Sequence, residues 1–314
     1  MPTTDVGLTT ASRVSVFTRA TFAAVAMAVG LGTAGAVGDV VHTRLGIDGF
    51  ALRLSVALTC FVITVPLVVL LRTRVDRRSL AGLGLGTRHA VRAFASGVLI
   101  TVAAAATTFA VGTGLGWLHW GAVEWPTLVT FLLANTLVAL LLEAVPEELA
   151  FRGYGYRTLN ARLRKWTASL ATTGLFLLTP AAASAVQALV NSLLGGPVRP
   201  LTFAPPGEDP VSYAILLAVF GFTLLVARIA TGSLWTCVAL HLTFLTVNRM
   251  TLLGDARNAG WSAQLNTPDA VLLVPAYLLL TALAFVVLAR VRGHRLGWRD
   301  RGPEPAGTDT IRAR

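Results

Sequence analysis

The sequence predicts an all-α membrane protein, a polytopic bundle of about eight transmembrane helices with both termini in the cytoplasm. Of its 314 residues, 54% are hydrophobic and 13% are charged, which is about half the charge expected of a soluble domain. Several nearly uncharged runs reach the roughly 20 residues that cross a bilayer. The basic residues lie mostly between these runs, as the orienting charges of membrane proteins do. Together these observations exclude an ordinary soluble enzyme.

Eight apolar runs are the expected spans. The first run, of about 25 residues, is longer than the core of a signal peptide, so we expect it to be retained as the first span. Residues 1–16 would form a cytoplasmic N-terminal segment, 17–290 one membrane domain, and 291–314 a basic, disordered cytoplasmic tail. The expected spans cover residues 17–41, 50–71, 94–115, 126–144, 166–194, 211–230, 234–253 and 270–288.

The basic residues predict the orientation. An even number of spans places both termini on one side, and the side richer in Lys and Arg is cytoplasmic. With the termini inside, 21 of the 26 Lys and Arg residues lie in the cytoplasm. We therefore expect a multi-pass protein of the plasma membrane, surrounded by the lipid bilayer. The same placement argues against nucleic acid as a partner, despite a net charge of +11.

Ionisable residues gather at the end of the fourth expected span, where burial in the membrane would cost several kcal/mol each. Glu143, Glu147 and Glu148 fall within six positions, and Arg152 follows. Glu148 and Arg152 are four apart, so on a helix they share a face and can pair. Glu147 lies about 100° away and stays unpaired, which leaves it available as a general base that activates water. Glu143, one turn earlier, could share the proton of Glu147. Such a cluster is also typical of a solvated helix end.

His241 is the second candidate, seven residues into the seventh expected span and about 10 Å from its cytoplasmic end. A single membrane histidine is often structural, bonded to a neighbouring backbone or hydroxyl group. Glu147 and His241 enter from the same side, however. They could form one polar cavity in which a carboxylate deprotonates water and an imidazole polarises a carbonyl.

The residues around this cluster resemble a known family. Residues 146–153 form an E-E-x-x-x-R motif with Phe before the arginine and Gly after it. This motif resembles the first signature of the CPBP intramembrane proteases, which include the CAAX prenyl proteases and bacteriocin-processing or immunity proteins. Residues 78–85 resemble the family's Gly-Leu segment, and 231–235 resemble the lead-in to its last motif, at His241. The resemblance covers about residues 75–255.

The resemblance implies an endopeptidase that cleaves a peptide bond near the cytoplasmic membrane face. Glu147 would be the water-activating glutamate, Glu148 and Arg152 its supporting pair, and His241 a stabiliser of the transition state. The implied substrate is a peptide or a protein C-terminus, as in CAAX-like processing.

Two positions depart from the family pattern. Pro180 stands where the second motif, Phe-x-x-x-His, has its histidine, and Leu245 stands where the third motif, His-x-x-x-Asn, has its asparagine. Removing one oxyanion donor typically costs about 10² to 10³ in rate. The alternative reading is therefore a catalytically degenerate relative that acts as a membrane binding or immunity protein. Polar groups that could replace the missing side chains are Thr179, Ser184, Gln187 and, less favourably placed, Asn248.

No cofactor is assured by the sequence. A catalytic zinc needs three protein ligands, and only Glu147, Glu148 and His241 are available, so a divalent metal stays an option with an incomplete ligand set. Cys60 and Cys237 both lie within apolar runs and can build neither a disulfide framework nor a thiolate metal site. A transporter is disfavoured because the sequence shows no inverted repeat.

Overall fold

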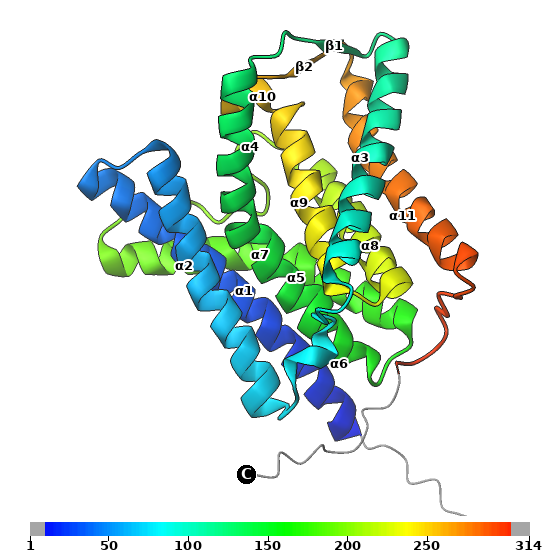
Figure 1. The fold of residues 1–314 in the computed structure, drawn as a ribbon. Coiled ribbons are helices and arrows are strands. Elements are labelled where there is room, and N and C mark those ends of the chain that lie inside the picture. The colour runs from blue at the N-terminus through cyan, green and yellow to red at the C-terminus, as the bar shows by residue number, and fades with distance from the viewer. Residues whose placement is uncertain (1–9, 303–314) are drawn as a thin grey trace, which may run out of the picture.

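The computed structural model describes residues 10–302, and it is built almost entirely of helices (Figure 1). Short π-helical and 3-10 segments connect or interrupt the longer helices. The helices are α1 (Thr10–Leu45), α2 (Gly49–Leu70), α3 (Ala90–Gly114), α4 (Trp125–Ala139), α5 (Val145–Glu148), α6 (Tyr156–Asn160), α7 (Lys165–Leu194), α8 (Pro210–Thr231), α9 (Leu234–Met250), α10 (Gly254–Arg257) and α11 (Leu273–Val291). The π-helical segments are Leu71–Val75, Leu140–Ala144 and Leu149–Gly155, the 3-10 segments are Leu80–Leu83 and Pro268–Leu272, and the strands are β1 (Leu118–Trp120) and β2 (Ala263–Leu265).

Within the described residues, seven helices are long and apolar enough to cross a membrane. This confirms the prediction of an all-α polytopic bundle. The seventh expected span, 234–253, is not among these seven helices; it forms α9, whose 17 residues would extend about 25 Å. Ten of its first eleven residues are buried, and α9 lies in the middle of the bundle beside α3, α4 and α8 (Figure 1). The helix that carries His241 is thus surrounded by protein.

Close helix packing holds α9 in this central position. A side chain at Gly97 of α3 would come within 2.7 Å of both the Ala239 Cβ and the Thr236 carbonyl of α9. The Thr236 hydroxyl also donates to the Ala93 carbonyl of α3, at 3.0 Å. Small residues and hydroxyl-to-backbone bonds of this kind are what hold helices together where lipid removes the hydrophobic driving force.

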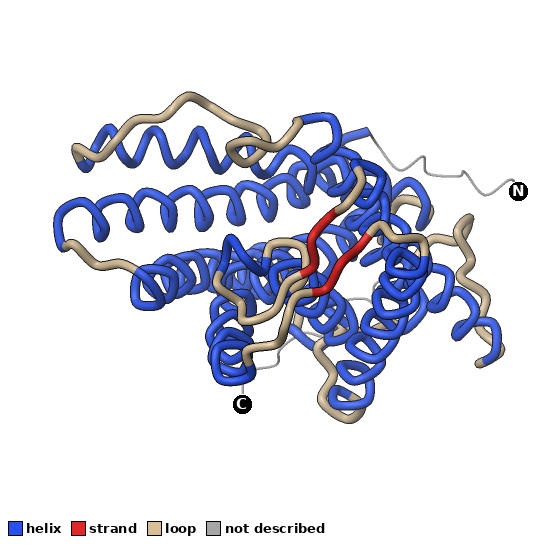
Figure 2. Tube along the Cα trace, turned by 90° about the horizontal axis from the view of Figure 1, so that it is seen from above, coloured by secondary structure: helices blue, strands red, loops and turns tan. Residues whose placement is uncertain are grey.

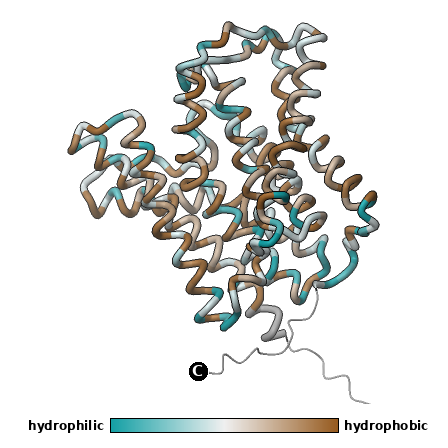
Figure 3. Tube along the Cα trace, viewed as in Figure 1, coloured by the Kyte–Doolittle hydropathy of each residue, from teal (hydrophilic) through white to brown (hydrophobic). Residues whose placement is uncertain are grey.

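Both described ends of the chain lie at one end of the bundle, the lower end in Figure 1. At the opposite end β1 and β2 form an antiparallel ribbon that pairs Leu118 with Leu265, and Figure 2 shows this ribbon crossing the helix ends from above. Hydrophobic residues run along the helices, and many hydrophilic ones lie in the terminal loops (Figure 3). Termini on one side are what an even number of spans requires; a cytoplasmic location for them stays a prediction.

The C-terminal region differs from the sequence-based expectation of a disordered tail. Residues 292–302 return to the bundle, where the Trp166 amide donates to the Trp298 carbonyl at 3.1 Å. The Trp298 ring stacks on Phe222, with centroids 5.9 Å apart. Aromatic stacking of this kind helps to offset the entropy of ordering a polar segment. Residues 303–314 and 1–9 lie outside the described part, so the expectation for them stays a prediction.

Candidate active site

The segment that carries the acidic motif is a helix of changing pitch. Below α4 the chain passes through the π-helical turn Leu140–Ala144, the short α5 and the longer π-helical stretch Leu149–Gly155. Pro146, in α5, has no N–H to give to the carbonyl one turn earlier, and a wider turn before it accommodates the lost hydrogen bond. Such π-helical insertions shift the phase of the side chains that follow them, so they decide which way each glutamate faces.

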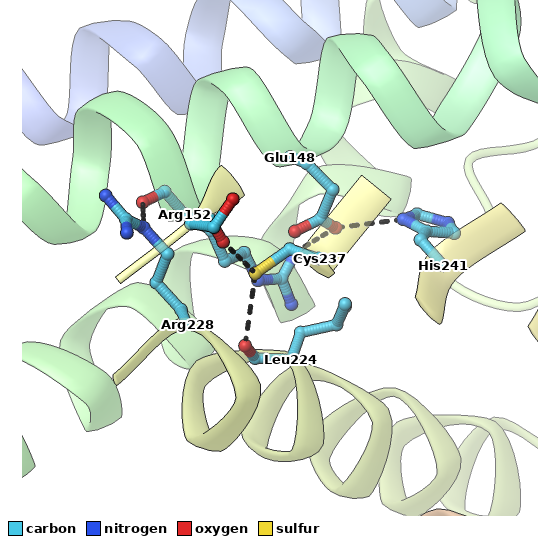
Figure 4. A network of polar contacts seen from close by, with 7 residues as sticks. Glu148, Arg152, Leu224, Arg228, Cys237 and His241 are labelled. Atoms are coloured by element: carbon cyan, nitrogen blue, oxygen red, sulfur yellow. Dashed lines mark hydrogen bonds and ion pairs between the residues drawn. The ribbon is translucent and has the colours of Figure 1, made fainter. Parts of the chain in front are cut away.

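Glu148 is the centre of a buried polar network (Figure 4). Its Oε1 accepts a hydrogen bond from the Arg152 Nη1 at 3.2 Å and lies 2.9 Å from the His241 Nδ1. The side chains of Glu148 and Arg152 are 0% exposed and that of His241 is 2% exposed. The expected pair of Glu148 and Arg152 is therefore present. The contact between Glu148 and His241, which are 93 positions apart, is an addition that the sequence did not indicate.

Arg152 is held on three sides. Its guanidinium lies 4.5 Å from the centroid of the Phe176 ring, a cation–π arrangement that favours a positive charge in a buried place. Gly221 leaves room for it, because a Cβ there would approach the Arg152 Nη2 to 3.3 Å. The Arg152 backbone carbonyl accepts from the Arg228 Nε at 3.2 Å.

Arg228 is a positioning residue that sequence reasoning missed. It lies near the end of the expected span 211–230, where it would be interpreted as an orienting charge at the membrane surface, yet it is 6% exposed. Its Nη2 donates to the Leu83 carbonyl at 3.0 Å, and its Nη1 donates to the Gly232 carbonyl. It thereby joins the Gly-Leu segment, the acidic motif and the start of α9. Its acceptors are all backbone carbonyls, which no sequence motif marks. A single sequence therefore cannot distinguish such a buried arginine from one that orients the protein in the membrane.

Glu147 faces a different environment from Glu148. It is half-buried, and no hydrogen bond or ion pair joins it to another residue in the described part of the chain. It lines a cavity of about 270 Å³ that we call the inner cavity. The same cavity is lined by His241 and by both departure positions, Pro180 and Leu245. The structure therefore brings all of these motif positions to one place.

Glu143 also lines the inner cavity, but it has its own partner. The Arg249 Nη2 donates to the Glu143 Oε1 at 2.5 Å, and the two side chains are 19% and 14% exposed. Asn135 accepts from the Arg249 Nη1 at 3.4 Å. The expectation that Glu143 shares the proton of Glu147 is not supported by this geometry, because Glu143 is neutralised by the arginine.

Of the suggested replacement groups, only Thr179 lines the inner cavity. Asn248 lies elsewhere, donating to the Phe244 carbonyl at 2.8 Å and to the Tyr277 hydroxyl at 2.6 Å. Gln187 is bonded to Asp39 at 2.8 Å. A phenol that sequence reasoning missed, Tyr213 of α8, lines the cavity instead. A single tyrosine near the start of a span gives no signal in the sequence that it contributes to a site.

A metal would have to be bound by few protein ligands. Among residues 10–302, no group of three or more His, Cys, Asp or Glu side chains is placed to hold a metal ion.

A comparison with protein families addresses this site directly. Residues 125–247 match a family described as type II CAAX prenyl endopeptidase Rce1-like. The matched residues are thus similar to a family of CAAX-type proteases. The matched region begins at the N-terminus of α4 and ends in α9, so it contains both the acidic motif and His241. No curated protein and no solved structure matches the chain.

This match confirms the resemblance seen in the sequence and supports a CAAX-type intramembrane protease in general. The protein is a multi-pass membrane protein in which the two glutamates of the motif have unlike surroundings. Glu148 is enclosed between a guanidinium and an imidazole, and Glu147 reaches a cavity large enough for water and a peptide group.

Proposed function

We propose that this protein is an intramembrane endopeptidase of the plasma membrane that hydrolyses a peptide bond with a water activated by Glu147. The observation that carries the proposal is that Glu147 and His241 line one cavity. The Glu148 Oε1 lies 2.9 Å from the His241 Nδ1. By the CAAX-type family match, its substrates are peptides or protein C-termini.

Glu147 and Glu148 have different proposed roles because their surroundings differ. Glu148 is fully buried, and one of its oxygens is shared by Arg152 and His241. A carboxylate held in this way orients the imidazole, as the second partner of a catalytic histidine generally does. Glu147 makes no ion pair in the described structure, so its carboxylate is free to accept a proton from water.

The reaction follows from this arrangement. Glu147 takes a proton from a water molecule as the water oxygen bonds to the scissile carbonyl carbon. Because the His241 Nδ1 faces Glu148, the other ring nitrogen, Nε2, is left to donate to the developing oxyanion when the ring is protonated. The C–N bond then breaks, and the proton held by Glu147 passes to the departing amine. The negative charges of Glu147 and Glu148 balance the positive charges of Arg152 and a protonated His241. A low-dielectric site favours such a neutral set of groups.

The departures at Pro180 and Leu245 bear on the rate. Neither side chain can donate a hydrogen bond, and each missing donor or proton-transfer partner typically costs about 10² or more in rate. The phenol of Tyr213 is the group in the inner cavity that can donate in place of the missing asparagine.

The test is cleavage of a quenched fluorogenic peptide with a farnesylated CAAX end, by purified protein in nanodiscs. Glu147→Gln should lower the rate by about 10² to 10⁴ without unfolding the protein. Glu143→Gln is the matched control, because Glu143 lies one turn earlier and lines the same cavity but is paired with Arg249. Equal activity of wild type and Glu147→Gln would refute the proposal.

A second candidate function is a catalytically silent binding protein. It is favoured by one observation, namely that Pro180 and Leu245 both form part of the cavity wall where the family pattern has donors. In that case the wild type would bind the farnesylated peptide without turnover, and Glu147→Gln would bind it equally well.

A further inference from the structure

The inner cavity adjoins a second, larger one. The second cavity, which we call the outer cavity, has a volume of about 490 Å³. Four residues line both cavities: Leu31 of α1, Leu142 of the first π-helical turn, Pro180 of α7 and Tyr213 of α8. Because they come from four different elements, they surround the junction. The outer cavity is roofed by the loop between α7 and α8, with Thr202 and Phe203 among its lining residues.

One face of α7 forms a continuous wall along this passage. Phe176 and Pro180 line the inner cavity, and Ser184, Gln187 and Asn191 line the outer one. These positions follow each other at intervals of three or four, which is the spacing of one helical face. From Phe176 to Asn191 the wall is about 22 Å long, the length of six or seven residues of an extended peptide at about 3.3 Å each.

This wall offers a hydrogen-bond acceptor. Asp39 accepts from the side-chain amides of Gln187 and Asn191, both at 2.8 Å, and Asn191 also donates to the Pro197 carbonyl. The Asn191 Oδ1 has no partner among the described residues, but it is buried beside Gly196 and is not accessible from the cavity. An acceptor is left at Pro180, which has no N–H to give to the Phe176 carbonyl.

The opposite end of the site is closed. Beyond Glu148, every residue of the π-helical stretch Leu149–Gly155 is buried. Arg228 seals this side through its bonds to backbone carbonyls, and Figure 4 shows it beyond Arg152, on the side away from His241. The π-helical stretch therefore leaves no opening to Glu147 on this side, which faces the arginine-rich end of the bundle where α7 begins at Lys165.

We propose that the outer cavity binds the extended polypeptide on one side of the scissile bond, and that the substrate enters beneath the loop between α7 and α8. Its ligand is an uncharged, extended peptide segment, one of whose backbone N–H groups meets the Phe176 carbonyl of α7. This inference rests on the proposed function. It places the entrance at the end of the bundle opposite the arginine-rich one, whereas the sequence led us to expect the reaction near the arginine-rich, cytoplasmic face.

The loop between α7 and α8 is held over the outer cavity by contacts to neighbouring helices. Its backbone is tied to α7 by the Thr202 amide, which donates to the Ser184 hydroxyl at 3.0 Å. Its Phe203 ring packs edge-on against Tyr213 at the junction, with centroids 5.7 Å apart. Arg199 anchors the other side of the loop on Asp39 at 3.1 Å. The loop is thus attached at a few points over an otherwise hollow space.

Photo-crosslinking tests the binding site without requiring turnover. In the Glu147→Gln background, p-benzoylphenylalanine in place of Phe203 should crosslink the farnesylated CAAX peptide, and unlabelled peptide should compete. The same group in place of Val91, which is 83% exposed at the arginine-rich end of α3, should give no crosslink. Crosslinking from position 91 and not from 203 would overturn the inference.

Filling the outer cavity tests its part in catalysis. Ala188 lines this cavity, and Ala182 is an exposed alanine on the same helix that lines neither cavity. Ala188→Trp should lower kcat/KM by about tenfold or more, whereas Ala182→Trp should retain the wild-type value. Equal values for the two variants would contradict the inference.

If the wild type does not cleave but position 203 still crosslinks the peptide, the proposed function fails and the binding site stands. If the wild type cleaves while position 203 gives no crosslink, the binding site fails alone.

Discussion

The buried pair of Glu148 and Arg152 makes a prediction about stability that separates the two glutamates of the motif. Both side chains of the pair are 0% exposed, and their polar atoms lie 3.2 Å apart. Removing one partner of such a pair typically costs about 3 to 5 kcal/mol, because the other charge stays buried without compensation. Arg152→Met should reach this range. Glu148→Gln should fall at its lower end, since the amide oxygen can still accept from Arg152.

The double variant sharpens the test. With both charges removed, no uncompensated charge remains, so Glu148→Gln with Arg152→Met should cost less than the sum of the two single changes. The matched control is Glu143→Gln, whose pair with Arg249 is partly exposed and should contribute about 0 to 1 kcal/mol.

Thermal unfolding in detergent, followed by the fluorescence of the seven tryptophans, measures these differences. At roughly 2 to 4 °C per kcal/mol, the single variants should unfold about 6 to 20 °C below the wild type. The control should stay within about 4 °C. Strict additivity of the double variant, or a control as unstable as Glu148→Gln, would show that the buried pair is not the source of the effect.

Two further predictions concern α9. His241→Gln should lower the rate of peptide cleavage by about 10² to 10³, because the oxyanion loses a charged donor; a rate within threefold of wild type, about 0.7 kcal/mol in barrier height, would remove His241 from the mechanism. Gly97→Val should destabilise the protein by about 1 to 3 kcal/mol, because α3 and α9 are already in contact there. Gly114→Val, on the same helix with nothing within 4 Å of its Cβ position, is the control in the same unfolding assay, and equal losses would argue against close packing at Gly97.

Much of the fold could be predicted because hydrophobic runs of bilayer length leave few alternatives to a helix. Seven of the eight expected spans correspond to helices long enough to cross a membrane. The pairing of Glu148 with Arg152 was also predictable, since it depends on a spacing of four residues. The placement of residues 292–302 was not, because it depends on the contact of Trp298 with Phe222, 76 positions away in the chain.

Asp39 illustrates the same limit. In the sequence it has no visible partner, yet it accepts from Gln187, Asn191 and Arg199, which follow it by 148 to 160 positions. Asp39 can accept from the side-chain amides of α7 only because α1 packs closely against α7. Gly32 allows this packing, because it approaches the Ala183 carbonyl closely. No local pattern encodes such a contact.

The sequence by itself determined the class of protein, the helices and the acidic motif, since each depends on composition or on spacing within one helix. Only the tertiary structure decided that Glu148, and not Glu147, contacts His241, that Arg228 is bonded to the backbone of the acidic motif, and that Glu147 lines a cavity with Pro180 and Leu245. These features join segments that are far apart in the chain. Their geometry is set by which helix faces pack together and where π-helical turns shift the phase of the side chains.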